Sequence, residues 1–190
     1  SEDMGESWAK ISPDLTTNDP KKQNQEDSGG LSRDNSGAEN HCTIFTIAES
    51  PLDDNVVWVG TDDGNLQLTK DGGKTWTNVV ANVPGLPKNT MTYHIEASVF
   101  EKGRAYAVFT GYQTGDMNTY IYRTNDFGAT WKSISTSDIY GFARSLQEDY
   151  VNENLLFVGT EFGLFITLDG GTSWYKFTNN MPAANVHYLE

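Results

Sequence analysis

The chain has 190 residues, of which 37% are hydrophobic and 12% aromatic, enough to bury a core between packed sheets. Its formal net charge of −13 argues against binding to nucleic acid or to an anionic membrane surface, because phosphate recognition needs clustered Lys and Arg side chains. No apolar run approaches the roughly 20 residues of a membrane span, and no secretory signal peptide is recognisable.

The first predicted element, at residues 1–8, is one copy of an eight-residue motif, Ser/Thr-x-Asp-x-Gly-x-Ser/Thr-Trp. Further copies lie at 69–76, 124–131 and 167–174, so the chain is built from an internal repeat. The Asp side chain can bond the backbone of a tight turn, Gly can take a positive φ, and a buried Trp ring can anchor the turn. We therefore expect the Asp side chains to bond turn amides and the Trp rings of the three later copies to be largely buried. These motif residues should form turns rather than act in catalysis: Asp3, Gly5, Trp8, Asp71, Gly73, Trp76, Asp126, Gly128, Trp131, Asp169, Gly171 and Trp174.

The motif resembles the Asp-box, or bacterial neuraminidase repeat (BNR), of sialidases, some glucanases and the sortilin family. The longer stretches 5–16, 55–61 and 155–160 are similar to those of bacterial proteins with sortilin-like propellers. The resemblance implies β-propeller blades in which the motif forms the turn between the third and fourth strands. It says little about activity, because one fold serves many functions.

In chain order, residues 1–11 are expected to hold a motif and the last strand of a preceding blade, and 12–42 a long polar surface loop that is either functional or disordered. Three blades of four antiparallel strands are predicted at 43–80, 91–135 and 142–178, and the first strand of a following blade at 183–190. Repetition of a four-strand unit favours an all-β propeller over a sandwich or barrel. A closed propeller typically has four to eight blades, so we expect this chain to be part of a larger one.

The first strand of each blade lines the axial channel of a propeller. Aligning the repeats on Ile47, Ile95 and Leu146 makes Thr46, His94 and Ser145 equivalent, followed by Ala48, Glu96 and Gln147. The candidates for a polar binding site in the channel are His94, Glu96, Arg144 and Gln147. The alternative is that these side chains only hydrogen-bond neighbouring blades.

No motif of a common hydrolase, metalloprotease, nucleotide-binding protein or redox protein is present. Glycoside hydrolysis needs two carboxylates at a fixed separation, and no pair can be singled out among 26 acidic residues. None of the four arginines lies in the Arg-Ile-Pro signature of sialidases.

No cofactor is expected, and no metal site is assigned. His41 and the single Cys42 lack further ligands, and one cysteine cannot form an internal disulfide. Calcium remains an alternative at the acidic turns 53–55, 62–64 and 148–149, although Asp and Asn also favour turns for backbone reasons alone.

These observations predict a non-enzymatic binding or interaction scaffold, a fragment of an extracellular or periplasmic Asp-box propeller with a protein or glycan ligand. One alternative is a polysaccharide-active glycoside hydrolase with catalytic residues partly outside this chain. Another is a structural component of an extracellular assembly. The open blade edges are expected to be covered by the rest of a longer chain or by another copy.

Overall fold

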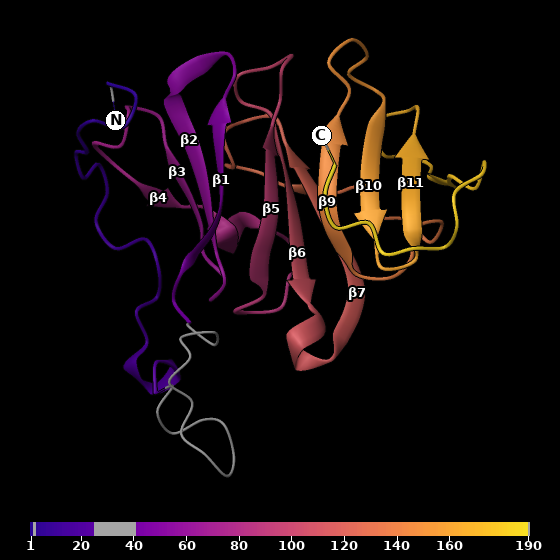
Figure 1. Cartoon of the computed structure of the whole chain (residues 1–190), viewed down its shortest axis with the longest axis horizontal. Helices are drawn as coiled ribbons and strands as arrows, with labels where there is room; N and C mark the ends of the chain where they lie inside the picture. Colours follow the sequence, from indigo (N-terminus) through magenta and orange to yellow (C-terminus); the bar gives the residue numbers. More distant parts are fainter. Residues whose placement is uncertain (2, 25–40, 190) are drawn as a thin grey trace.

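The computed structural model describes residues 1, 3–24 and 41–189, which contain three four-stranded antiparallel sheets. Figure 1 shows the sheets following one another along the chain, each with its strands in sequence order. The prediction of an all-β chain made of four-stranded propeller blades is confirmed. The first blade contains β1 (Ile44–Ser50), β2 (Asp53–Thr61), β3 (Leu66–Thr69) and β4 (Thr77–Asn78); the second β5 (Met91–Ala97), β6 (Ala105–Gly111), β7 (Asp116–Thr124) and β8 (Lys132–Ser133); the third β9 (Ala143–Glu148), β10 (Leu156–Thr160), β11 (Gly163–Thr167) and β12 (Tyr175–Lys176).

The first strands of the three blades lie next to one another, β1 against β5 and β5 against β9, and they point the same way in Figure 1. Two apolar cores fill the spaces between blades. Trp58, Ile95 and Trp131 belong to the core between the first and second blades. Tyr106 and Leu146 belong to the core between the second and third. Because each core is shared by two blades, stability depends on face-to-face blade packing.

The motif turns also join neighbouring blades. All four motif Gly residues have a positive φ. In the three later turns, the Gly also lies against the residue three positions after the Trp of the preceding motif. A Cβ at these positions would lie too close to its neighbour, so glycine is needed for both backbone conformation and space. The clashes would be at 2.7 Å between Gly73 and the Ile11 carbonyl oxygen, 3.0 Å between Gly128 and Val79 Cγ2, and 2.8 Å between Gly171 and Ile134 Cβ.

The two end segments lack the strands expected for them. Residues 7–11 are irregular, although the Ile11 carbonyl accepts a hydrogen bond from Trp76 Nε1 at 3.2 Å. Residues 183–189 are irregular as well, although Val186 N donates to the Thr160 carbonyl at 3.0 Å. Each segment lies against a blade, but the described residues offer it no neighbouring strand with which to form a ladder.

The expectation that all three later motif tryptophans are largely buried is wrong for Trp76. Trp131 and Trp174 are buried, Trp76 is half-buried and Trp8 is 81% exposed. Trp131 lies edge-on to Trp58 of the first blade, with ring centroids 5.9 Å apart, and Trp174 Nε1 donates to the Ile134 carbonyl at 2.8 Å. Trp76 has only the irregular N-terminal segment against it, because no complete sheet precedes the first blade in the described chain.

Most of the predicted loop 12–42 lies outside the described residues. Its described beginning packs on the first blade, where Leu15 is buried and its carbonyl accepts bonds from Asn65 and Gln67. A single-turn 3-10 helix, η1 (Pro20–Lys22), follows. Among the described residues, no helix has the length and apolar character needed to cross a membrane.

Candidate binding site at the inner strands

Three of the four channel candidates, His94, Glu96 and Gln147, form contacts between β5 of the second blade and β9 of the third. His94 Nε2 lies 2.9 Å from the Leu146 carbonyl oxygen, and Gln147 Nε2 donates to Glu96 Oε1 at 2.6 Å. The strand register agrees with the sequence alignment, since His94 pairs with Val108 in the second blade and Ser145 pairs with Gly159 at the equivalent position of the third. In the structure, these three side chains therefore hydrogen-bond a neighbouring blade, which is the alternative given in the sequence analysis.

Burial also moves these groups toward their neutral forms. It raises the pKa of Glu96 to about 7, and the nearby Glu148 carboxylate adds to the rise. Burial lowers the pKa of His94, despite the Leu146 carbonyl that favours protonation. This part of the channel is therefore a largely neutral hydrogen-bonded contact between blades.

A second polar cluster, around Glu148, also joins the second and third blades. Glu148 is 2% exposed and accepts hydrogen bonds from Tyr106 Oη at 2.9 Å and Val99 N at 3.0 Å. Burial and the Glu148 charge raise the pKa of Tyr106 above its ordinary value, so the phenol remains a donor. Because both carboxylate oxygens have partners, the cluster stabilises the blade contact and leaves no free group for chemistry.

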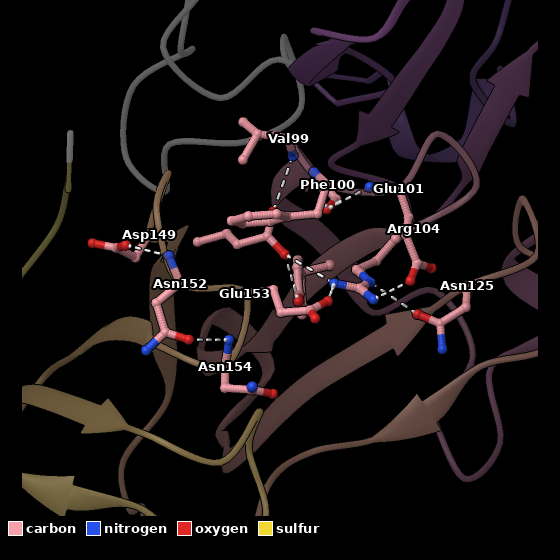
Figure 2. A network of polar contacts seen from close by, with 12 residues as sticks. Val99, Phe100, Glu101, Arg104, Asn125, Asp149, Asn152, Glu153 and Asn154 are labelled. Carbon is pink, nitrogen blue, oxygen red and sulfur yellow. Dashed lines mark hydrogen bonds and ion pairs between the residues drawn. The ribbon is translucent and has the colours of Figure 1, made fainter.

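Arg104 belongs to the same cluster, and Figure 2 shows its guanidinium between Glu101, Glu153 and Asn125. Its guanidinium lies 3.6 Å from Glu148, donates to Glu153 at 2.8 Å and Glu101 at 2.5 Å, and donates through Nε to Asn125 at 3.2 Å. Three carboxylates thus surround one buried arginine, a charge-assisted arrangement that fixes its position.

The acidic turns bond to their own neighbourhoods. Asp53 pairs with Lys102 at 2.5 Å, Asp62 accepts from the Thr43 amide at 2.8 Å, and Asp63 accepts from Thr61 and from Thr17. Within the described ranges, no three His, Cys, Asp or Glu side chains gather where they could hold a metal ion. Nothing in the geometry of these turns favours calcium.

The fourth candidate, Arg144, belongs to a feature that the sequence did not reveal. Each inner strand carries a β-bulge at the same position, and the extra residue is Phe45 in β1, Tyr93 in β5 and Arg144 in β9. The Phe45 and Tyr93 rings lie 5.0 Å apart, and Arg144 Nη1 donates to Tyr93 Oη at 2.8 Å. These three residues, one from each blade, form what we term the bulge row. Bulges redirect side chains and are common beside functional sites.

Aromatic rings hold the Arg144 guanidinium on three sides. Its Cζ lies 4.9 Å from the ring centres of Tyr112 and Phe142 and 5.4 Å from that of Tyr93. Tyr112, in the 3-10 helix η4 (Tyr112–Thr114), stacks on Phe142 at 5.0 Å. Cation–π contacts of this kind orient an arginine without neutralising its charge.

A hollow of about 930 Å³ adjoins the bulge row. Phe45 and Tyr112 contribute to its lining, together with Met91 and Thr110 from the ends of β5 and β6 and Asn89 from the turn before β5. Thr110 is 1% exposed, and its hydroxyl has no hydrogen-bond partner among the described residues. A shallower hollow of about 610 Å³ covers only the turn at 49–54, so it brings together no side chains from different blades.

Comparisons with known proteins support the propeller and leave the family open. No family model matches the chain. It is 31% identical over 88 residues to a probable oligoxyloglucan-reducing end-specific xyloglucanase of Neosartorya fischeri, a match covering 46% of this chain and 10% of that protein.

The similar solved structures are β-propeller proteins. An ancestral GH74 enzyme matches with a TM-score of 0.57 and 18% identity, over 74% of this chain and 19% of that one. YCF48 from Cyanidioschyzon merolae matches with a TM-score of 0.52 and 21% identity, over 70% and 36%. A structure of YCF48 bound to D1 peptide gives a TM-score of 0.53 at 19% identity, over 73% and 40%. The chain thus spans only part of each relative, and the structural likeness shows the fold alone.

Proposed function

We propose that this chain is part of a non-enzymatic binding scaffold, an Asp-box propeller of the extracellular space or periplasm, which binds a protein ligand at the bulge row. The observation that carries the proposal is the contrast between the two sets of inner-strand residues. His94, Glu96 and Gln147 only join neighbouring blades. The bulge row is also joined across blades, by the Arg144–Tyr93 bond, but its arginine has no ion pair among the described residues and its Phe45 lines a hollow. Aromatic residues and arginine are the side chains most enriched at the energetic centres of protein interfaces.

The motif geometry supports the Asp-box assignment. In the second motif, Asp71 accepts hydrogen bonds from the Thr75 amide at 2.9 Å and the Thr69 hydroxyl at 2.8 Å, and Gly73 N donates to Thr69 at 2.9 Å. The same bonds recur around Asp3, Asp126 and Asp169. Four such turns act as local staples, so their residues have structural roles in this proposal.

A protein ligand is supported by the YCF48 structure that contains a D1 peptide, since that protein has a similar fold. The bulge row also presents side chains at one end of three adjacent strands, where a ligand can contact several blades at once. A binding site in a repeat protein commonly forms in this way, from equivalent positions of successive repeats.

The proposal is tested by probing the 190-residue chain on a peptide array with free carboxyl termini and on a glycan array. Tyr112→Ala removes one wall of the site and is expected to weaken peptide binding about tenfold or more. Tyr150→Ala is the matched control, because Tyr150 is 82% exposed in the turn beyond the opposite end of β9. Equal effects of the two variants, or no peptide binding, would contradict the proposal.

Glycoside hydrolysis is a second candidate, carried by one observation. The raised pKa of Glu96 keeps a proton on its carboxyl group, as a general acid requires, and the 31%-identical relative is a probable xyloglucanase. In this case the chain would release reducing sugar from xyloglucan, and Glu96→Gln would abolish the release while Glu49→Gln, on exposed β1, would not. Absence of sugar release would remove this candidate for the chain.

A further inference from the structure

We infer that Arg144 recognises the C-terminal carboxylate of the peptide ligand, while an apolar side chain of the ligand lies along the bulge row. This inference rests on the proposed function and identifies the chemistry of the same site. It follows from the charge environment of Arg144, its fixed orientation and the surface beside it.

The charge environment of Arg144 differs sharply from that of Arg104. Arg104 has three carboxylates within 4 Å, from Glu101, Glu148 and Glu153. Arg144 forms no ion pair with any of the described residues, in a chain whose acidic residues outnumber its Lys and Arg residues two to one, 26 to 13. A partly buried guanidinium without a counter-ion has lost hydration without gaining a charge partner, and a ligand carboxylate would supply one.

The orientation of Arg144 leaves a specific edge of the guanidinium available. Nη1 donates to Tyr93 Oη, and Nε is buried without a partner among the described residues. Nη2 is not one of the buried atoms that lack a partner, so the Nη1–Nη2 edge is the one that can meet a ligand. The rings of Tyr112 and Phe142 hold the group in place. A planar guanidinium binds a carboxylate through two parallel N–H donors, and prior immobilisation reduces the entropy lost on binding.

The surface beside Arg144 favours a peptide over an acidic polysaccharide. Phe45 of the bulge row is 48% exposed, and its ring lies 5.0 Å from that of Tyr93, so an apolar surface continues from Arg144 along the row. Such a surface can hold an apolar side chain of a peptide. The net charge of −13 also repels a polyanion, whereas a single carboxylate meets little long-range repulsion.

The hollow provides room for the residues that precede such a carboxylate. Its lining combines apolar side chains, such as Phe45 and Met91, with polar ones, such as the exposed Asn89, that can bond a peptide backbone group. Phe45 and Tyr112 line the hollow and also contact, respectively, Tyr93 and Arg144. The hollow and the arginine are therefore continuous parts of one site.

The experiment uses N-acetyl-leucyl-leucine, its C-terminal amide and trigalacturonate as probes, with NMR detection of the arginine Nε–H resonances. The free acid is expected to shift the Arg144 resonance and to bind about tenfold or more tightly than the amide. Arg144→Gln should abolish this preference for the acid, and Arg144→Lys should retain part of it. Arg123→Gln is the control, since Arg123 lies on β7 near Gly170, away from the bulge row.

The acid-versus-amide comparison on the unaltered chain needs no variant, so a folding defect in Arg144→Gln cannot obscure the result. Equal binding of acid and amide would overturn the inference, as would no binding by either. Binding of trigalacturonate alone would overturn it in favour of an acidic glycan. If the array peptides bind but tolerate Arg144→Gln, the carboxylate assignment fails and the proposed function stands; if no array peptide binds, the proposed function itself fails.

Discussion

Replacing Glu96 with Gln is expected to remove a pH-dependent destabilisation of the fold. Glu96 accepts a hydrogen bond from Gln147 Nε2 at 2.6 Å, and burial raises its pKa from 4.5 to about 7. A Gln side chain has nearly the same shape, and its carbonyl oxygen can accept the same bond. The substitution therefore removes the ionisation and keeps the contact.

The sign follows from proton binding in the two states. Between pH 4.5 and about pH 7 the folded chain holds a proton on Glu96 that the unfolded chain has lost, so stability falls as the pH rises through this range. The full pKa difference corresponds to about 3 kcal/mol, and partial contact of the side chain with solvent reduces our expectation to roughly 2 kcal/mol. The free energy of unfolding of the Gln variant, compared with that of the parent, should therefore be higher at pH 8 than at pH 4 by about this amount.

Urea unfolding at half-unit intervals from pH 4 to pH 8 measures the effect. The lowered pKa of His94 acts with the opposite sign, because the fold loses stability as the pH falls below the ordinary value of 6.5. Both proteins contain His94, so the difference between their curves isolates Glu96. Glu49→Gln, on the exposed part of β1, is the matched control and should run parallel to the parent. Parallel curves for parent and Glu96→Gln would refute the reasoning that Glu96 is protonated in the folded chain.

The motif turns could be predicted from sequence because their bonds are local. Asp71 reaches Thr69 and Thr75, which are two and four residues away, and the positive φ of Gly73 belongs to the same turn. Strand equivalence between blades could also be predicted, since repeats fold alike. His94 and Ser145, aligned from the sequence, do occupy equivalent positions of their ladders.

The features that sequence analysis missed depend on contacts between distant segments. The alignment of Thr46, His94 and Ser145 also makes Phe45, Tyr93 and Arg144 equivalent, but it does not show the bulges. A bulge is a property of the pairing between two strands, so the contact of these three side chains could not be predicted from one strand's sequence. Glu148, interpreted as part of an acidic turn, is buried by Tyr106, which lies 42 residues earlier. The exposure of Trp76 depends on what precedes the first blade, which its own repeat does not encode.

Three further predictions concern the packing between blades and the motif turns. Trp131→Ala should lower the free energy of unfolding by about 3–5 kcal/mol, measured in urea, and the half-buried Trp76→Ala by clearly less; equal losses would contradict the packing described. Hydrogen bonds from Ser173 and Thr167 lower the pKa of Asp169 to about 2, so its contribution to stability is present above pH 3.8 and is lost as the pH falls from there to about 2. Asp169→Asn should therefore weaken the fall of the melting temperature over this pH range, and an unchanged fall would contradict the prediction. Finally, Glu148→Ala should cost about 3 kcal/mol, because it leaves the Tyr106 hydroxyl and an amide buried without acceptors, while Arg104 keeps two other carboxylates. Tyr106→Phe removes one donor and leaves the carboxylate its other partners, so it should cost about 1 kcal/mol. If urea unfolding showed the same loss for both variants, Glu148 would not be the centre of the contact between these blades.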